Sequence, residues 1–422
     1  MNKSCRLENT LSRAVLPAAA LVCLVVAGFF VKWCLANSIA AQVQLKEVAE
    51  LSVALAPNDP QTHYSLAVLN EKTFLSADLP KSLAEFERAT MLAPYDFRLW
   101  LALGKARERN GDAAGAELVL KKALALAPNY SSVQWTLGNI LLRRGKTREA
   151  FGEIRRAAEN NVTYRGQAIL TAWQIFGGDL ASVRQHIGDA PNLNSTLAVF
   201  LAKEKRFDEA LEIWDALPAE EKKTTLKSDG DVLFGLMLAE KKYRAALQIQ
   251  QSIEEETGAE SFAPGKIYNG GFESEIIREK ASIFDWHIAD GAQPQIGFDD
   301  TQKHGGNRSL VIIYNSASGK DFRTVSQTAV AEARKTYAVE LFYKSDLKTA
   351  AALRWEVVDA SDGKILATTN IISNNADWTN LKAEFTASEN TQAVTLRLAR
   401  QECKSAVCPI LGKVWFDDFA IK

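Results

Sequence analysis

The sequence predicts three successive parts: a single transmembrane helix, an all-α solenoid of helical hairpins and an all-β sandwich. Three observations support this order. Residues 14–31 form an apolar run without charge, a pattern of helical hairpins then repeats every 34 residues, and apolar residues alternate with polar ones in several segments after residue 266. At 422 residues the chain has room for two or three domains.

The first part is the apolar run at residues 14–31. At about 1.5 Å per residue, a helix of this length spans about 27 Å, close to the hydrocarbon thickness of about 30 Å. Lys32 and Trp33 follow, where residues that anchor a helix at the membrane interface belong. The sequence therefore predicts a transmembrane helix over residues 14–36.

Charge at the N-terminus predicts the orientation of this helix. Residues 1–13 carry three basic side chains and one acidic one, which favours a cytoplasmic tail. The rest of the chain would then be periplasmic or extracellular, on a single-pass protein of the inner (cell) membrane. A cleaved signal peptide is the alternative, with small residues at Ser38–Ala40, but the length of the apolar run favours an uncleaved anchor.

The second part is organised around the segment Phe97–Pro128, which has the pattern of one helical hairpin. Gly111 is expected to end its first helix, because glycine adopts the left-handed conformation without a Cβ penalty. Asp112 is expected to cap the next helix. The small residues Gly104 and Ala116 allow the two helices to approach closely.

The hairpin recurs along the chain. Gly104 and Gly138 are 34 residues apart, and so are Pro94 and Pro128. A 34-residue unit of two helices, with Trp, Leu, Gly, Ala and Pro in these positions, resembles the tetratricopeptide (TPR) family. The resemblance implies a TPR-type solenoid that binds protein partners on its concave face; an unrelated helical bundle is the alternative.

About six units fit between residues 40 and 255. Residues 40–57 have the pattern of the second helix of a repeat, so the array is expected to start directly after the membrane helix. Residues 60–94 form a full hairpin, and residues 197–217 another after a weaker stretch. Residues 256–265 are polar and end in Pro and Gly, which predicts a linker.

The third part, residues 266–422, has the pattern of an antiparallel β-sandwich. Apolar residues alternate from Tyr337 to Tyr343, from Leu381 to Phe385 and from Val394 to Leu398. Seven or eight such strands in this length suit a jelly roll.

Four short motifs give this third part a family resemblance. IYNGGFE at residues 267–273 is followed by Trp286, HGGNRSL at residues 304–310 and VWFDDFAI at residues 414–421. Their order resembles the carbohydrate-binding modules of the family 4 and 9 type, among the galactose-binding-like jelly rolls. The resemblance implies a polysaccharide as a partner.

The same resemblance implies a structural calcium ion. Glu273 and Asp418 match the positions that hold it, with Asp417 as a substitute. Calcium prefers several oxygen ligands, and the first and last strands are expected to be neighbours. The alternative is that Glu273 faces solvent and that Asp417–Asp418 form a turn.

Sugar binding needs aromatic faces and hydrogen-bonding groups. We predict Tyr314 and Trp355 as stacking surfaces, with Arg354 to bond hydroxyl groups. Trp286, Trp378 and Trp415 are expected in the core, where the resembling family keeps aromatic residues.

Two cysteines, Cys403 and Cys408, lie five positions apart near the end of the chain. They suit a disulfide, half of a metal site or two free thiols. A location outside the cytoplasm favours the disulfide.

No catalytic constellation is visible. The chain lacks GxxxxGK, HExxH and GxSxG motifs, so no catalytic residue is predicted. With 50 basic and 51 acidic residues, bulk charge gives no support for a nucleic-acid partner. We predict a non-enzymatic, membrane-anchored scaffold in cell-envelope or exopolysaccharide assembly; the alternatives are a carbohydrate-active enzyme with a site between its domains and a purely structural adaptor without a glycan ligand.

Overall fold

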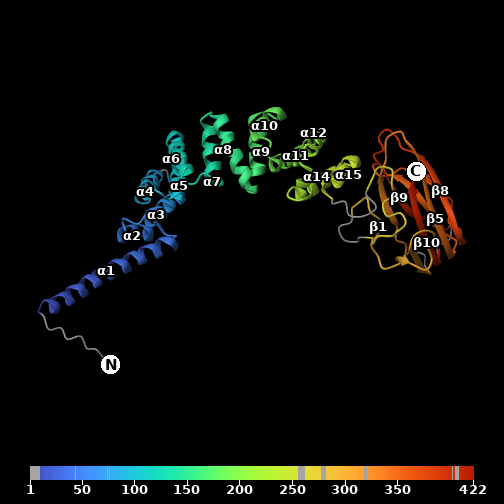
Figure 1. Cartoon of the computed structure of the whole chain (residues 1–422), viewed down its shortest axis with the longest axis horizontal. Helices are drawn as coiled ribbons and strands as arrows, with labels where there is room; N and C mark the ends of the chain where they lie inside the picture. The colour runs from blue at the N-terminus through green and yellow to red at the C-terminus, as the bar shows by residue number, and fades with distance from the viewer. Residues whose placement is uncertain are drawn as a thin grey trace, which may run out of the picture. The chain divides into compact units, whose positions relative to one another are not determined.

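Figure 1 shows the computed structural model, which describes residues 10–42, 44–73, 75, 77–254, 262–276, 282–317, 321–401, 403 and 408–422. Fifteen helices precede ten strands in this part of the chain. Contacts divide the chain into two compact units, Met1–Leu193 and Asn194–Lys422. Most of the predicted tail (1–13) and of the predicted linker (256–265) lies outside the described residues.

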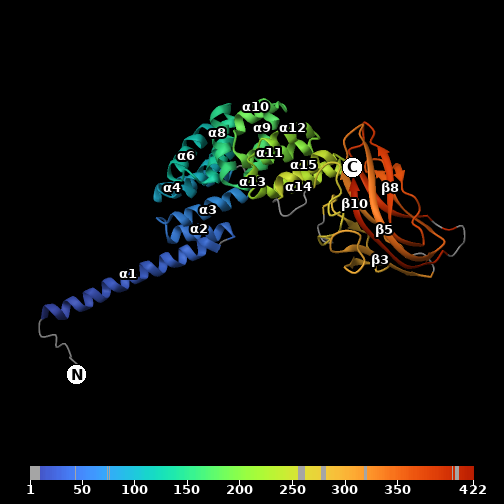
Figure 2. The same ribbon diagram turned by 45° about the vertical axis from the view of Figure 1, so that its right-hand side comes forward.

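Helix α1 (Thr10–Gln42) contains the predicted span. Among the described residues it is the one helix long and apolar enough to cross a membrane, a property that a signal sequence shares. The apolar part of α1 is exposed, whereas Ala36 and Ala40 in its last turns are buried against the helices that follow. Figures 1 and 2 show α1 as one continuous helix up to these neighbours.

The end of α1 thus includes residues that were predicted to begin the next helix. Residues 40–42 belong to α1, and only Lys46–Leu55 form α2. The prediction of a single second helix over residues 40–57 was therefore wrong at its start. The helical array begins directly after α1, and the membrane span itself stays a prediction.

The helices after α2 form successive hairpins, with the five-residue α13 between α12 and α14. Their bounds are α3 Pro60–Lys72, α4 Leu79–Leu92, α5 Phe97–Arg109, α6 Ala113–Leu126, α7 Ser131–Arg143, α8 Thr147–Asn160, α9 Val162–Ile175, α10 Leu180–Ile187, α11 Pro191–Lys203, α12 Phe207–Asp215, α13 Ala219–Lys223, α14 Lys227–Ala239 and α15 Tyr243–Ile253.

The α5–α6 hairpin confirms the local reasoning from sequence. Gly111 has a φ of +81°, and the Asp112 carboxylate accepts from the main-chain N–H of Gly115 at 2.8 Å. A Cβ added at Gly104 would lie 2.5 Å from Cγ of Leu120. A larger residue at this position would therefore force the Leu120 side chain to shift.

The strands form two antiparallel five-stranded sheets, in the orders β1-β4-β9-β6-β7 and β2-β3-β10-β5-β8. Figure 2 shows β3, β10, β5 and β8 of the second sheet. The bounds are β1 His287–Ile288, β2 Gln295–Asp299, β3 Ser309–Ser316, β4 Val325–Val330, β5 Thr336–Thr349, β6 Ala352–Asp359, β7 Ile365–Thr368, β8 Asn375–Thr386, β9 Ala393–Gln401 and β10 Ile410–Ile421.

The core of the sandwich is aromatic at its centre. Trp286 and Trp355 meet edge to face with ring centroids 6.1 Å apart. Phe419 contacts both rings, at 4.9 and 4.8 Å. Alternate residues of each strand supply the remaining core side chains, as the period-two pattern predicts.

Helix α15 is bonded to the loops of the sandwich within the second unit. The Arg244 guanidinium donates to the main-chain carbonyls of Ala331 at 2.9 Å and Thr391 at 2.7 Å. The hydroxyl of Tyr243 donates to the carbonyl of Ala360 at 3.0 Å. The last helical hairpin therefore belongs to the same compact unit as the β-sandwich.

Candidate functional site

The end of β10 carries two adjacent acids that face one loop. A β-bulge shifts the register between Asp417 and Ala420, and Asp418 has a φ of +50°. In a regular strand, adjacent side chains would point to opposite faces. Here Asp417 accepts from the main-chain N–H groups of His304 at 2.8 Å and Gly305 at 3.0 Å, while Asp418 contacts Nδ1 of His304 at 2.6 Å.

The same loop also binds an acid from the start of the sandwich. Glu273 accepts from the main-chain N–H of Asn307 at 2.8 Å and from its side-chain amide at 2.9 Å. The main-chain hydrogen bond from Asn307 is the largest cause of a lowered pKa for Glu273. Burial acts in the opposite direction on Asp417 and raises its pKa. The loop at residues 304–308 therefore ties the first and last segments of the sandwich together.

Two glycines leave room for the acids. A Cβ added at Gly305 would lie 2.7 Å from Oδ2 of Asp418, and one added at Gly306 would lie 2.0 Å from Oε1 of Glu273. Gly306 also has a φ of +55°, a conformation that side chains other than glycine rarely adopt. The two glycines of the HGG sequence thus allow the main chain to contact the carboxylates of Asp418 and Glu273.

An aromatic cluster lies beside these acids, on the outer surface of the second sheet. The imidazole of His304 is stacked on Phe342, with ring centroids 3.6 Å apart and an interplanar angle of 12°. Trp378 meets His304 edge to face at 5.8 Å. His304 is exposed, and Phe342 and Trp378 are half-buried, so part of each side chain is accessible from solvent.

Polar side chains surround this cluster. Asp377 precedes Trp378 in β8 and forms an ion pair of 3.0 Å with Lys344 of β5, whose hydrogen bond lowers the pKa of Asp377. Asn380 lies opposite Phe342 in the β5–β8 pairing. Partly exposed rings flanked by a carboxylate, an ammonium group and an amide have the chemistry that sugar rings need: apolar faces for C–H groups and hydrogen-bond partners for hydroxyls.

The predicted stacking residues occupy different positions. Trp355 is 0% exposed and Tyr314 is 2% exposed, and both lie inside the core. A ring enclosed on both faces cannot stack on a sugar, so this part of the prediction is corrected. Burial also raises the pKa of the Tyr314 hydroxyl.

Arg354 lies on the other side of β6 from Trp355. Its guanidinium donates to Glu356 at 3.1 Å, and Arg397 of β9 donates to the second oxygen of the same carboxylate at 2.9 Å. Glu356 is buried beneath the two arginines. The structure therefore does not bring Arg354 together with Tyr314 and Trp355.

The other tryptophans divide differently from the prediction. Trp286 lies in the core, as expected. Trp415 is buried but outside the core cluster that includes its neighbours Val414 and Phe416, and its indole N–H donates to Asp299 at 2.9 Å. Trp378 was expected in the core but is half-buried. Phe342 and His304 were missed as rings on the domain surface, although Phe342 occupies the outward phase of an alternating strand.

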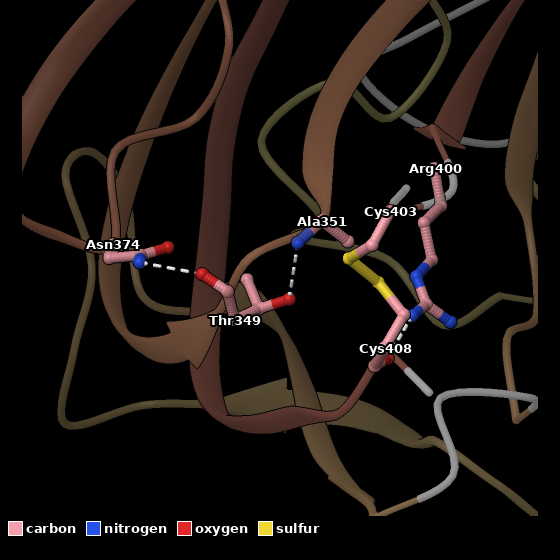
Figure 3. Close-up of a disulfide and its surroundings, with 6 residues drawn as sticks. All are labelled: Thr349, Ala351, Asn374, Arg400, Cys403 and Cys408. Carbon is pink, nitrogen blue, oxygen red and sulfur yellow. Dashed lines mark hydrogen bonds between the residues drawn. A yellow bond between two sulfur atoms is a disulfide. The ribbon is translucent and has the colours of Figure 1, made fainter. Parts of the chain in front are cut away.

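Cys403 and Cys408 form a disulfide, with Cα atoms 5.6 Å apart. Figure 3 shows this bond between the ends of β9 and β10, where the Arg400 guanidinium donates to the carbonyl of Cys408. Cys23 and Cys34, on α1, are free and exposed. Cys403 and Cys408 are therefore neither half of a metal site nor two free thiols.

No group of three or more His, Cys, Asp or Glu side chains suitable for a metal ion occurs in the described part of the chain. Two carboxylates, Glu273 and Asp418, still meet at the glycine loop. A cation at this position would need main-chain carbonyls for most of its oxygen ligands. Calcium therefore stays a prediction.

A second recessed surface lies in the helical array. It extends over α3, α4 and α5 and combines apolar side chains with charged ones; its lining residues are Tyr64, Val68, Glu71, Phe86, Arg98, Leu101, Ala102, Lys105 and Arg109. Mixed linings of this kind suit a peptide segment that offers both apolar and charged side chains.

Comparison with protein families identifies the class of the C-terminal part. Residues 265–405 match the family described as "Carbohydrate binding domain". The chain therefore combines a TPR-like helical array with a β-sandwich of the carbohydrate-binding type. Comparison with curated proteins gives no significant match.

Solved structures resemble each part separately. A structure described as "CBM4 structure and function" is 18% identical, covers 37% of this chain and 98% of its own, and has a TM-score of 0.29. The CBM22-1–GH10 modules of a Clostridium thermocellum xylanase, complexed with xylohexaose, are 17% identical over 38% of this chain and 29% of that one, with a TM-score of 0.26. "MamA MSR-1 C2" is 23% identical over 27% of this chain and 64% of that one, with a TM-score of 0.25. These likenesses concern the fold alone.

Proposed function

We propose that this protein is a non-enzymatic scaffold, anchored in the inner membrane, that binds a protein partner through its helical array and a glycan through its β-sandwich. Its place would be cell-envelope or exopolysaccharide assembly. One observation carries the glycan part of this proposal. A domain whose sequence matches a carbohydrate-binding family has the ring cluster His304–Phe342–Trp378 on its surface.

The packing of α1 supports an uncleaved anchor. The amide of Asn37 donates to Asp59 at 3.0 Å, and the hydroxyl of Ser65 donates to the carbonyl of Ala40 at 2.7 Å. Ala40 is 4% exposed. Cleavage at Ser38–Ala40 would break the helix where it forms part of the first repeat.

The disulfide supports an extracytoplasmic location for the sandwich. Structural disulfides persist in oxidising compartments and are rare in the cytoplasm, and Cys403 and Cys408 are joined. With the basic tail of residues 1–13 in the cytoplasm, the single span carries everything after α1 to the periplasmic side. The sandwich would then have access to glycans of the envelope.

Calcium is part of the proposal for the sandwich. The carboxylates of Asp418 and Glu273 converge on the backbone of Gly305 and Gly306, which brings two anionic groups to one loop. These two carboxylates would hold the ion together with main-chain carbonyls. When bound, calcium would act only as a cross-link between the ends of the domain.

The bonds between α15 and the sandwich favour a second candidate function. Arg244 donates to the carbonyls of Ala331 and Thr391, which suits a sandwich that caps the exposed end of the helical array. Terminal repeats of solenoids need such a cap. Capping alone would give an adaptor without a glycan ligand, and glycan binding separates the two functions.

Deletion of the gene tests the scaffold role in the cell. We expect polysaccharide output to fall, and we expect the full-length protein to restore it. A variant with Trp378→Ala should restore output only in part, because it keeps the anchor and the array. Full polysaccharide output in the deletion strain would contradict the proposed function.

A further inference from the structure

A basic cavity lies between the second helices of two successive hairpins, α8 and α10. It is lined by Arg148, Phe151, Gly152, Arg155, Gln185 and His186, and has a volume of about 560 Å³. Small-molecule sites usually have about 300–1,000 Å³, so the cavity exceeds what a single inorganic ion fills. It is separate from the recessed surface over α3–α5, with which it shares no lining residue.

Aromatic packing fixes the histidine of this cavity. His186 is stacked on Phe176 with ring centroids 4.2 Å apart and meets Phe151 edge to face at 5.3 Å. Its Nδ1 bonds the main-chain carbonyl of Ser182 at 2.8 Å. Since a carbonyl only accepts, Nδ1 carries a hydrogen, and Nε2 is the other polar atom of the ring.

The charged residues that line the cavity are all basic. Arg148 and Arg155 are both cations, and no lining residue is acidic. Among the described residues, no hydrogen bond or ion pair neutralises Arg148. Arg155 has one partner, Glu159, at 3.6 Å, and an exposed pair of this kind contributes little to stability. Both guanidinium groups are therefore available to an anion.

No neighbouring atom requires a glycine at position 152, in the middle of α8. A Cβ added there would meet nothing within 4 Å, and glycine costs about 1 kcal/mol relative to alanine inside a helix. Its position in the cavity wall offers a reason, because any side chain would project into the free space. The side chain of Arg155 packs against Gly188, where an added Cβ would lie 2.9 Å from Cδ of Arg155.

We propose that this cavity is a binding site for a small organic anion, one carboxylate or phosphate group carried on a body about the size of a sugar ring. Arg148 and Arg155 would bind the anionic group by charge-assisted hydrogen bonds. Phe151, His186 and Gln185 would contact the rest of the molecule. The site lies within the first compact unit and does not depend on the glycan surface of the sandwich.

Isothermal titration of the full chain in detergent tests this site. The probes are glucuronate, glucose 1-phosphate, inorganic phosphate and neutral glucose. We expect at least one of the two anionic sugars to bind, and Arg148→Gln or Arg155→Gln to weaken its binding about tenfold or more. Arg156→Gln is the matched control, because Arg156 lies on the same helix but pairs with Glu153 at 2.9 Å outside the cavity.

A second pair of variants separates loss of binding from loss of folding. Gly152→Leu should place a side chain in the cavity and weaken binding, whereas Gly166→Leu in α9, where a Cβ also meets nothing within 4 Å, should leave binding unchanged. Which sugar binds identifies a uronate or a phosphate ligand. Failure of both anionic sugars, equal binding of inorganic phosphate and the sugar phosphate, or equal binding by wild type and Gly152→Leu would overturn the proposal.

Discussion

The imidazole ring of His304 lies parallel to the phenyl ring of Phe342, with centroids 3.6 Å apart. This contact joins the HGG loop to β5, and the same imidazole bonds Asp418 at 2.6 Å. His304 therefore links the acidic cluster at the end of β10 to the ring surface that includes Trp378. One residue thus connects the proposed calcium site with the proposed glycan surface.

Glu273→Gln should destabilise the sandwich by about 1–2 kcal/mol at pH 7, because one of two hydrogen bonds from Asn307 loses its acceptor. The pKa of Glu273 is lowered by folding from an ordinary value of 4.5. Its ionised form therefore stabilises the fold above that pH, and this stability is lost as pH falls through the lowered pKa.

Denaturation of both proteins between pH 3 and 7 measures this effect. The difference between wild type and Glu273→Gln should narrow below about pH 4.5; the opposite contribution of Asp417, whose pKa is raised, is common to both and cancels. Glu275→Gln is the control, since Glu275 is 76% exposed. A difference that stays constant with pH would contradict the assigned role of Glu273.

Calcium should raise the thermal stability of the sandwich if Glu273 and Asp418 hold the ion. We expect the Tm of the wild type to rise in calcium and to fall again with a chelator, since a ligand that binds only the folded state stabilises it. Asp418→Asn should reduce this shift. An identical Tm with calcium and with chelator would contradict a calcium site at Glu273 and Asp418.

Loss of the disulfide should cost about 2 kcal/mol of stability, the loop-closure entropy expected for a short loop. Urea denaturation of the Cys403→Ser, Cys408→Ser double variant measures it. Wild type in reductant should match this variant, whereas Cys23→Ser and Cys34→Ser should unfold like the wild type because both cysteines are free. A reductant without effect on the wild type would contradict a structural role for the bond.

An uncleaved α1 predicts that the protein purified from membranes keeps its N-terminal residues. Mass spectrometry of the intact chain should give a mass that includes residues 14–36. Asn37→Ala should lower stability by about 1 kcal/mol, because Asp59 loses a hydrogen bond. A mature N-terminus at residue 41 would show that α1 is a signal sequence and would end the anchor proposal.

Local patterns predicted the fold well. The 34-residue repeat, the turn glycine Gly111 and the cap Asp112 depend on neighbouring residues, so the hairpins follow from sequence. The period-two alternation likewise predicted β5, β8 and β9. The extension of α1 to Gln42 was missed, because burial of Ala36 and Ala40 depends on α2 and α3 rather than on local composition.

The candidate site was predicted less well, because a strand pattern does not say which residues face the core. Trp355 and Arg354 are neighbours, and only the fold shows that the tryptophan points inward. The bulge at Asp417–Asp418 turns both acids toward the same loop, which the alternating pattern excludes. Trp378 lies two residues from Asn380, which pairs with Phe342, so the alternation of β8 itself places Trp378 on the outer face.

Glycan binding by the full chain in detergent, measured on an array of envelope polysaccharides, is the decisive test of the proposed glycan surface. We expect the wild type to bind and Trp378→Ala to weaken binding about tenfold or more, as for truncation of an aromatic anchor. Ile371→Ala should bind like the wild type, because Ile371 is an exposed apolar residue, 57% accessible, on the same domain. Absence of any glycan ligand, or equal binding by wild type and Trp378→Ala, would contradict the proposed glycan surface.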